Sequence, residues 1–548
     1  MKKIKFVIAL SLLPLLIASC TYLPFFNKVK NQFIQKERID DASIINEQNK
    51  FDVLENKLKF RFNIPKKILF GDVTTVFRVL SDSLNKIYLN FYDNMIINSV
   101  KSKNENLIYN RDNNYLIIER KFSKNDTAAI EINYSGTPET EGFSSFDFTT
   151  IGKATNVYSL SEPNYAPTWW PCKDRIDDKF FVSIEAEYPD SLKLAAQGKL
   201  IERKEENGLI KEKRKSEYPI STYLVSLNLG KFSHWSDIYT TQDTLCSMPV
   251  SYYAFPAYEE DARIDWARTP EMINFYSSIF GEYPFVNEGY GMAMFGWING
   301  AMEHQTISSM GYNTVTGNQV FDKIVVHELA HQWFGDAVTP VSWKDIWLNE
   351  GFATYAEALW VEYNDGKVSL SNYMNRLDNG YFYGTLYNPE VNLFGPTVYN
   401  KGGWCLHMLR GVTGDSLFFD ILRDYYSRYK YKNASTTDFK VVCEKIYGKE
   451  LDWFFNEWII KGTGRPEYEC NLKQNGSRFE INLKQIQSDD VYKMPVTFRI
   501  ETQSDVKNFT FFNNEREQVF TGEIQGKVKK LTLDPDNYIL KKVKKVTY

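Results

Sequence analysis

The sequence predicts a multidomain α+β protein, with a β-rich amino-terminal part, a mainly helical middle part and a small β sandwich at the carboxy terminus. Three observations support this fold class. The chain has 548 residues and a mass of 63.9 kDa, which is more than one hydrophobic core usually serves. Short runs of β-branched and aromatic residues, broken by Asn, Asp and Gly, occupy about 51–232. Amphipathic stretches with the helical period occupy about 233–463, and strand-like alternation returns after them.

The amino terminus predicts export and lipid attachment. It reads MKKIKFVIALSLLPLLIASC, a basic start followed by an apolar run that is too short for an ordinary membrane span. The final four residues of this stretch resemble a bacterial lipobox, in which Cys20 becomes the lipidated first residue of the mature protein. Ordinary signal-peptide cleavage is the alternative, but it prefers small residues at both flanking positions, and Ile17 is not small. We therefore expect a protein of the bacterial cell envelope, lipid-anchored to a membrane and facing either the periplasm or the outside.

The rest of the chain divides by its hydrophobic patterns. Strands are expected in segments such as NLIYNRDNNYLIIERKF and AAIEINYSG. Helices are expected at 267–280, 321–334, 345–363, 400–411 and 438–461. The carboxy-terminal segments RFEINL and MPVTFRI alternate again, and Asn475-Gly476 is a hairpin signal. The predicted division is a lipoprotein signal peptide at 1–19, a tether at 20–45, a β domain at 46–232, a helical domain at 233–463 and a β sandwich at 464–548.

Composition narrows the classes of partner. A formal net charge of -4 and a pI near 6.0 provide no basic field for nucleic acid, so nucleic acid is not expected as a partner. Hydrophobic residues make up 43% of the chain and aromatic residues 16%, which allows large cores and argues against extensive disorder. Five cysteines remain after Cys20, without any CxxC pair. An odd number in an exported chain leaves at least one thiol unpaired, so disulfides are not predicted.

The stretch KIVVHELAHQWFGD contains two of the five histidines of the chain, His327 and His331. On a helix, side chains four residues apart lie on one face, so the two imidazoles could bind the same metal ion. Glu328 is placed to take a proton from a water that the metal activates, which is the mechanism behind the His-Glu-x-x-His pattern of zinc hydrolases. An amphipathic helix with a polar His, Glu and His face is the alternative. In a chain with so few histidines, the metal site is favoured.

A catalytic zinc site usually has three protein ligands, so a third donor is needed. The segment WLNEGFATYAEALWVEY supplies Glu350, and the eighteen residues between His331 and Glu350 leave room for a second helix to return past the metal. The pairing of HELAH with NEGFA resembles the aminopeptidase N family of gluzincin metallopeptidases, which also includes leukotriene hydrolase. The resemblance implies a thermolysin-like, mainly helical catalytic domain over 233–463. It also implies one zinc ion held by His327, His331 and Glu350.

Glu357 is a candidate to orient one of the ligating histidines. Such a histidine normally donates its other ring proton to a carboxylate or a carbonyl. Glu357 follows Glu350 by seven residues and therefore lies on the same face of a helix. A solvent-exposed glutamate is the alternative at this spacing.

The resemblance further implies a site for the free α-ammonium group of a peptide. NGAMEHQT resembles the family's Gly-x-Met-Glu-Asn signature, whose glutamate holds the substrate's amino terminus, and this role falls on Glu303. Gly300 and Ala301 would offer backbone groups at close approach to the substrate. His304 stands where the family usually has Asn, which puts the fine geometry in question.

A second carboxylate is expected from the β domain. There, SEPNYAPTWWPCKDRIDDKF and PISTYLVSLNLGKF resemble landmarks of the same family. Glu162 occupies the position of the family's Gln or Glu contact to the ammonium group, and two fixed carboxylates suit one positive charge. A loop glutamate before Pro163 is the alternative.

Tyr399 is the candidate to stabilise the oxyanion. It lies in TVYNKGGWCLHML, which resembles the family's Tyr-x-Lys-Gly motif, and such a phenol can hydrogen-bond the oxyanion of a tetrahedral intermediate. The remaining histidines, His234, His304 and His407, lack ligand spacing and are expected to be structural.

Together, these resemblances predict a zinc-dependent aminopeptidase that acts on peptides with a free N-terminus and uses Glu328 as general base. One alternative is a zincin endopeptidase or an epoxide hydrolase on the same scaffold. A second is a catalytically silent peptide-binding lipoprotein, which the retention of every ligand and of the base disfavours. Longer family members carry a helical carboxy-terminal domain that covers the cleft, and this chain is expected to lack it.

Overall fold

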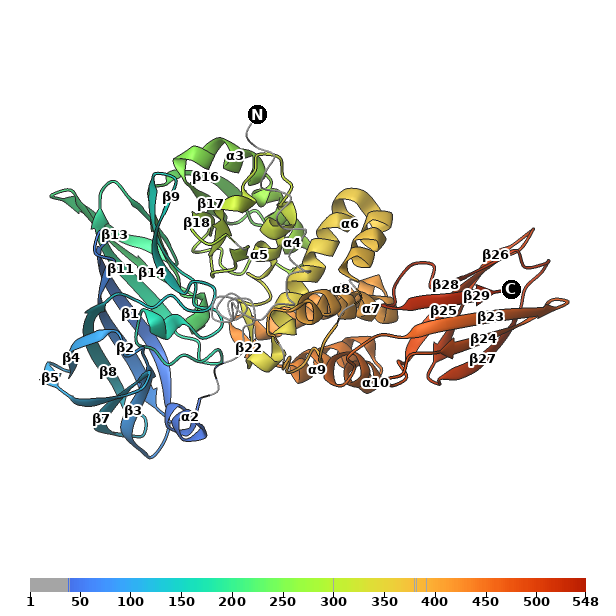
Figure 1. Ribbon diagram of the computed structural model, residues 1–548, viewed down its shortest axis with the longest axis horizontal. Coiled ribbons are helices and arrows are strands. Elements are labelled where there is room, and N and C mark those ends of the chain that lie inside the picture. Colours follow the sequence, from blue (N-terminus) through green and yellow to red (C-terminus); the bar gives the residue numbers. More distant parts are fainter. Residues whose placement is uncertain (1–37, 39, 299, 379, 381, 391) are drawn as a thin grey trace, which may run out of the picture.

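The computed structural model describes residue 38 and residues 40–548, apart from 299, 379, 381 and 391. Within these residues the molecule is elongated, with a β-rich part at one end, helices in the middle and a second β part at the other end (Figure 1). The predicted multidomain α+β class is confirmed. The predicted signal peptide and Cys20 lie outside the described residues. In the described part of the chain, no helix is both long enough and apolar enough to cross a membrane.

The amino-terminal part is built around an eight-stranded sheet with the strand order β13-β14-β11-β1-β2-β8-β4-β5. Its strands are β1 (Phe51–Asn63), β2 (Ile68–Val79), β4 (Ile96–Ser102), β5 (Glu105–Asn106), β8 (Thr127–Gly136), β11 (Phe181–Pro189), β13 (Lys199–Glu206) and β14 (Leu209–Lys215). Buried residues alternate along β2, as expected where one face of a sheet covers a core. The helix α2 (Ala42–Gln48) packs beside β3 (Ser83–Asn90) and begins inside the range predicted as a tether. The folded body therefore starts before residue 46.

Two smaller sheets complete this part. One has the order β3-β7-β6, with β6 (Ile108–Asp112) and β7 (Tyr115–Ser123). The other has the order β12-β15-β10-β9, with β9 (Phe146–Ile151), β10 (Ala154–Ser159), β12 (Lys193–Ala196) and β15 (Leu227–Gly230). The chain leaves β10 toward Glu162, and the fully buried Trp169 and Trp170 anchor the segment that follows. Burial of two indoles holds this segment against the core.

The middle part opens with a five-stranded sheet that the sequence patterns did not predict. Its order is β16-β17-β18-β20-β19. The strands are β16 (Ser233–Thr240), β17 (Ser247–Ala254), β18 (Tyr290–Phe295), β19 (Ala301–Met302) and β20 (Ile307–Gly311). Every residue of β18 and β20 is buried, so neither strand shows the alternation that marks a strand with one wet face. A uniformly buried strand of five or six residues cannot be told from a piece of helix by its pattern.

All five predicted helical stretches contain helices. The helices of the middle part are α3 (Glu259–Asp265), α4 (Thr269–Phe280), α5 (Asp322–Ala330), α6 (Trp347–Leu377), α7 (Gly402–Thr413), α8 (Asp415–Tyr429), α9 (Thr436–Tyr447) and α10 (Asp452–Phe455). Ser435 and Asp438 form a reciprocal capping box at the start of α9, which fixes where that helix begins. Gly448, with φ of 74°, ends it in the left-handed region. A parallel pair, β21 (Val338–Pro340) and β22 (Lys432–Ala434), joins distant loops of this part.

The carboxy-terminal part is a β sandwich of a four-stranded sheet, β27-β24-β23-β29, and a three-stranded sheet, β26-β25-β28. Its strands are β23 (Glu467–Asn475), β24 (Arg478–Gln485), β25 (Met494–Glu501), β26 (Val506–Asn513), β27 (Glu517–Glu523), β28 (Lys530–Leu533) and β29 (Lys542–Thr547). The rings of Phe479, Phe498 and Phe520 are buried between the sheets. Asn475 pairs with Arg478 across the tip that contains Gly476, whose φ of 61° suits a tight hairpin turn.

The five cysteines after Cys20 are free thiols among the described residues. Cys172, Cys405, Cys443 and Cys470 are buried, and Cys246 is exposed. Among the described residues, the fold is therefore held by packing and hydrogen bonds and not by disulfides.

His407 joins the helical part to the sandwich. It lies on α7 and is 1% exposed. Its Nδ1 accepts a hydrogen bond from the Tyr355 hydroxyl at 3.1 Å, and its Nε2 donates to the Asn537 carbonyl oxygen at 3.2 Å. Its ring also stacks on Tyr538, with ring centroids 5.0 Å apart. Its contacts are those of a structural residue, as expected from its lack of ligand spacing.

The protonation of His407 makes the fold acid-sensitive. Burial lowers the pKa of His407 from 6.5 to about 3, so the folded state keeps the ring neutral while the unfolded state binds a proton below about pH 6.5. The stability that depends on this difference is complete above the unfolded pKa and is lost as the pH falls toward 3. Between pH 7 and pH 5 the loss is about 2 kcal/mol from this group.

We expect His407→Gln to be less stable than the parent at pH 7 by about 1 to 3 kcal/mol, because buried hydrogen bonds are disturbed. The difference in unfolding free energy between the parent and the variant should become smaller as the pH falls to 5. The parent loses stability there because His407 binds a proton in the unfolded state, whereas glutamine binds none. Urea unfolding of the parent and the variant at pH 7 and at pH 5 measures this difference at each pH. His234→Gln, at an exposed position of β16, is the matched control and should change the pH dependence less. A difference in unfolding free energy that stays constant from pH 7 to pH 5 would contradict the role of His407 in the acid sensitivity.

Candidate functional site

The helix α5 carries His327 and places His331 one turn further on. The backbone N–H of His331 donates to the His327 carbonyl oxygen at 3.2 Å, so the helical turn continues through His331. The helix buries Val326 and Leu329 in the core, which leaves the two imidazoles on one face. Their ring centroids are 4.7 Å apart. The four-residue spacing of His327 and His331 therefore brings the two imidazole rings together on one face of the helix, as the sequence predicts.

Glu350 reaches the same place from the first turn of α6. Its Oε2 lies 3.2 Å from Nε2 of His327 and 3.3 Å from Nε2 of His331. A close crossing of two chain segments permits this arrangement. A Cβ added to Gly351 would lie 2.9 Å from the Cα of Gly402, so only glycine fits at this contact. The start of α7 is thereby held against the turn that carries Glu350.

The three side chains suit a metal ion by their chemistry. Their donor atoms lie within 4.8 Å of one another, and among the described residues Glu303, Glu328 and His331 form a second group that meets the same distance criterion. Two imidazole nitrogens and one carboxylate oxygen are the donor set of catalytic zinc sites. Glu350 is 2% exposed and His331 1%, so the ligands are shielded from bulk water. The residues therefore fit the zinc ion that the sequence predicts.

Hydrogen bonds from neighbouring groups fix the orientation of both imidazoles. Nδ1 of His327 lies 2.9 Å from Glu357 Oε1, and the Tyr373 hydroxyl donates to Glu357 Oε2 at 2.5 Å. Nδ1 of His331 lies 3.2 Å from the Phe334 carbonyl oxygen. Each Nδ1 thus has an acceptor beside it, which leaves the Nε2 atoms turned toward Glu350. Glu357 therefore lies beside His327, one of the two histidines that the sequence predicts as ligands.

Glu328 and Glu303 lie in the same small cavity as these histidines. The cavity has a volume of about 70 Å³, and it is lined by Phe143, Leu160, Glu162, Trp297, Ala301, Met302, Glu303, His327, Glu328, His331, Glu350, Phe394 and Tyr399. Every predicted catalytic, metal and ammonium-binding side chain therefore meets in one place. Gly300 is not among the lining residues. Its carbonyl oxygen instead accepts a hydrogen bond from the Gly311 N–H at 3.0 Å, because β19 pairs with β20 there.

The buried carboxylates repel one another. Burial raises the pKa of Glu328 to about 8, and Glu303 and Glu350 add to the rise while His327 and His331 oppose it. Burial, followed by the charge of Glu303, raises the pKa of Glu162 well above its usual value. Burial would also raise the pKa of Glu350, but the two histidines outweigh it and hold that pKa at about 2. So many buried carboxyl groups favour the entry of cations into the cavity.

Tyr399 lies against the ring of His327. The two rings are stacked, with centroids 5.8 Å apart and planes 11° apart. The tyrosine belongs to a π-helical turn, Thr397–Lys401, that leads directly into α7. Burial, together with the nearby charge of Glu350, raises the pKa of Tyr399 well above its usual value, so its hydroxyl keeps its proton. It can therefore act as a hydrogen-bond donor in the cavity.

Comparisons with known proteins relate the chain to one family of peptidases. Residues 265–458 match the peptidase family M1 domain. The chain is 24% identical over 430 residues to probable aminopeptidase 1 of Sulfurisphaera tokodaii, an alignment that covers 74% of this chain and 53% of that protein. It is also similar to the M1 zinc metallopeptidase of Deinococcus radiodurans in a mutant form bound to a Tyr-Ser-Ala substrate, with a TM-score of 0.67, 26% identity and coverage of 76% and 96%. These matches support the aminopeptidase N family of gluzincin metallopeptidases.

A solved structure of Legionella pneumophila aminopeptidase A shares the fold of this chain. The TM-score is 0.79 at 18% identity, and the match covers 90% of this chain and 60% of that one. This chain spans about half the length of the curated relatives that it matches.

His304, which departs from the family signature, does not line the cavity. Nδ1 of His304 lies 2.9 Å from the Ser309 hydroxyl on β20, and the residue is 0% exposed. Burial lowers the pKa of His304 to about 3, so the ring is neutral. The replacement of Asn by His is therefore accommodated beneath β20 and brings no charge to the site.

Two further residues hold Glu303, and no sequence pattern pointed to either of them. Asn349 Nδ2 donates to Glu303 Oε1 at 3.2 Å. Gln332 Nε2 donates to the Glu303 carbonyl oxygen at 3.2 Å. Gln332 follows the predicted zinc ligand His331 in the sequence, and Asn349 precedes the predicted zinc ligand Glu350. Residue spacing did not predict their contacts with Glu303, because these contacts join segments that are distant in the sequence.

Proposed function

We propose that this protein is a zinc-dependent aminopeptidase that removes N-terminal residues from peptides. One observation carries the proposal: a single cavity of about 70 Å³ holds a zinc-type donor set and, beside it, the carboxyl groups of Glu162 and Glu303. A metal site alone would suit many hydrolases. Carboxylates beside it provide a counter-charge for the ammonium group that only an unblocked peptide end carries. The aminopeptidase names of the curated relatives support the same activity.

The two glutamates come from different parts of the chain, and each would contact the same cation. Glu162 is 4% exposed and Glu303 is 3% exposed. Two ionised carboxylates in such a site repel each other unless a positive charge lies between them. An ammonium group bound there relieves this repulsion. It also places the first peptide carbonyl at a fixed distance from the reacting groups, which is how recognition of the end selects the first bond.

Catalysis then depends on five side chains around that carbonyl. His327, His331 and Glu350 would hold one zinc ion, which supplies a Lewis acid that polarises a carbonyl and lowers the pKa of water. Glu328 accepts the proton of the attacking water on its carboxylate and later delivers it to the leaving amine. The Tyr399 hydroxyl donates a hydrogen bond to the oxyanion as it forms. The buried position of Glu328, 6% exposed, keeps competing solvent away from this proton transfer.

Blocking the amino group of the substrate tests the proposal. We expect an aminoacyl p-nitroanilide to be hydrolysed and its N-acetylated form to be hydrolysed at least about 100-fold more slowly, because acetylation removes the charge that the two glutamates recognise. Glu303→Gln and Glu162→Gln should reduce kcat/KM for the free-amine substrate and shrink the ratio between the two substrates. Glu260→Gln, at an exposed position on α3, is the control. Equal cleavage of both substrates would favour the endopeptidase alternative.

We also propose that Cys20 carries lipid and anchors the protein in the bacterial cell envelope. The basic start, the short apolar run and the lipobox-like residues before Cys20 support this. In a bacterial host, Cys20→Ser should abolish incorporation of labelled fatty acid, and the protein should leave the membrane fraction. A parent protein that takes up no labelled fatty acid would refute the anchor without affecting the proposed activity.

A further inference from the structure

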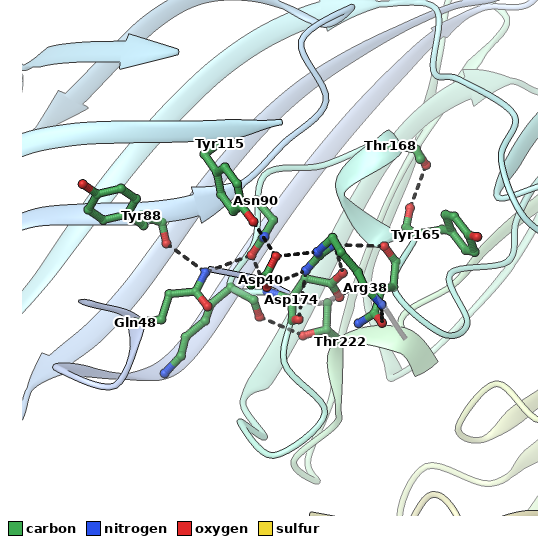
Figure 2. A network of polar contacts seen from close by, with 12 residues as sticks. Arg38, Asp40, Gln48, Tyr88, Asn90, Tyr115, Tyr165, Thr168, Asp174 and Thr222 are labelled. Carbon is green, nitrogen blue, oxygen red and sulfur yellow. Dashed lines mark hydrogen bonds and ion pairs between the residues drawn. The ribbon is translucent and has the colours of Figure 1, made fainter. Parts of the chain in front are cut away.

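Arg38 lies at the amino-terminal edge of the described chain and is enclosed by acidic groups. Figure 2 shows its guanidinium between Asp40 and Asp174, with Tyr115 beside Asp40. Nε and Nη2 of Arg38 donate to the two carboxylate oxygens of Asp40, at 2.8 Å and 3.2 Å. Nη1 donates to Asp174 Oδ2 at 3.0 Å. The Tyr115 hydroxyl of β7 also donates to Asp40, so the arginine is fixed in one geometry.

Arg38 holds Asn164 through two separate hydrogen bonds. Nη1 of Arg38 donates to the Asn164 carbonyl oxygen at 3.1 Å, and the backbone N–H of Arg38 donates to the Asn164 side-chain oxygen at 3.3 Å. Both the backbone and the side chain of one residue are therefore bound. A residue held in this way has little freedom to shift relative to its surroundings.

Asn164 lies inside the turn that carries Glu162. The Tyr165 N–H donates to the Ser161 carbonyl oxygen at 2.7 Å and closes the turn around Glu162. Trp169 Nε1 donates to the Ser161 hydroxyl at 3.1 Å. Glu162 Oε1 has no hydrogen-bond partner in the described part of the chain. The direction of the Glu162 carboxyl group therefore depends on the turn, which Arg38 holds through its two hydrogen bonds to Asn164.

Asp174 marks the far end of the same segment, 161–174. Its side chain is 2% exposed, and its backbone N–H donates to the Asn90 side-chain oxygen at 3.2 Å. Burial raises the pKa of Asp174 to about 6, although Arg38 opposes the rise. A single guanidinium thus binds the segment near both of its ends, at Asn164 and at Asp174. Removal of the Arg38 guanidinium would leave the buried carboxyl group of Asp174 without its cation. It would also free the turn around Glu162 from its contact with Arg38.

We propose that Arg38 is a positioning residue for the substrate's amino terminus, acting through the turn 161–165 on the carboxyl group of Glu162. The proposal rests on the proposed function, because Glu162 is taken to bind the substrate's ammonium group. It assigns a part in recognition to a residue that the sequence places in the tether between the lipid anchor and the enzyme body. The same chain segment would then both attach the enzyme and complete its substrate site.

Kinetics of Arg38→Gln separate positioning from a merely structural role. For an aminoacyl p-nitroanilide we expect KM to rise about tenfold while kcat changes less than about twofold, because ground-state binding of the ammonium group is weakened and the proton transfer at Glu328 is not. Bound zinc should be unchanged. Arg38→Lys should recover only part of the loss, because an ammonium group cannot reproduce the forked contacts.

Arg175→Gln is the matched control. Arg175 lies next to Asp174, and its guanidinium also pairs with an aspartate, donating to Asp177 at 2.9 Å and 2.7 Å and to Asn49 at 3.1 Å. It should leave KM within about twofold of the parent. A rise in KM equal to that of Arg38→Gln would show a general effect of losing an arginine–aspartate pair beside this segment and would overturn the proposal.

Hydrogen exchange supplies a readout that does not require activity. With Arg38→Gln, amides in 161–165 should exchange faster than in the parent, and with Arg175→Gln they should not. The double variant Arg38→Gln/Asp174→Asn removes the buried uncompensated charge, so it keeps the test usable if the single variant folds poorly. Faster exchange in the double variant supports the proposal, and unchanged exchange overturns it. If the parent hydrolyses no free-amine substrate, the proposed function fails, while the exchange experiment still decides whether Arg38 holds the turn.

Discussion

Glu328→Gln is expected to lower kcat by about 10² to 10⁴-fold while zinc remains bound. The amide has nearly the shape of the carboxyl group but cannot accept the proton of the attacking water. The effect should be large because Glu328 is buried, with 6% exposure, and bulk water cannot easily replace its function. The metal should stay because His327, His331 and Glu350 are untouched.

The measurement is kcat for an aminoacyl p-nitroanilide, together with zinc content by atomic absorption on the same samples. Glu260→Gln provides a glutamate-to-glutamine change at an exposed position and should leave both quantities unchanged. A Glu328→Gln variant with kcat within about threefold of the parent would exclude Glu328 as the general base, whatever its zinc content.

Glu350→Gln is expected to have the opposite pattern, with zinc lost first and activity lost as a consequence. Glu350 Oε2 lies 3.2 Å and 3.3 Å from the two histidine Nε2 atoms, and an amide oxygen is a much weaker ligand than a carboxylate. Loss of a group that only orients a ligand typically costs 10- to 100-fold in metal affinity, so loss of a ligand should cost more than about 100-fold. The variant should therefore release zinc to a chelator that the parent resists.

Thermal unfolding provides an independent measurement of the same site. A ligand at 100 times its Kd stabilises a folded protein by about 2.7 kcal/mol, so zinc should raise the Tm of the parent. The same zinc concentration should raise the Tm of Glu350→Gln much less, and that of Glu328→Gln as much as that of the parent. If Glu350→Gln kept both its zinc and its Tm shift, the third ligand would have to be sought elsewhere.

Local sequence patterns predicted which side chains of the candidate metal site share a helical face, because that relation is local. His327 and His331 are one helical turn apart, so their shared face follows from helix geometry alone. Glu350 and Glu357 follow the same rule on a second helix, and both lie beside the histidines. Glu303, Glu162 and Tyr399 had no such periodic relation to the zinc ligands. Their predicted roles came from resemblance to the family, and the fold brings all three into the cavity.

Relations between distant segments escaped the sequence patterns. The five-stranded sheet at the start of the middle part was not predicted, because β18 and β20 are buried along their whole length and lack alternation. The hydrogen bond from Tyr373 to Glu357 and the one from Asn349 to Glu303 depend on how separate elements pack. Arg38 was assigned to a tether, yet it binds Asn164 and Asp174, more than a hundred residues further along the chain.

The sequence by itself determined the fold class, and it predicted that His327 shares a helical face with His331 and Glu350 with Glu357, because the period of a helix converts residue spacing into shared faces. Only the tertiary structure decided which glutamates share the cavity with the two histidines and which amides and hydroxyls hydrogen-bond those glutamates. It also decided that Arg38 contacts Asn164 in the turn of Glu162. The physical reason is that such contacts are set by the packing of whole elements against one another, and packing leaves no periodic trace in the order of residues.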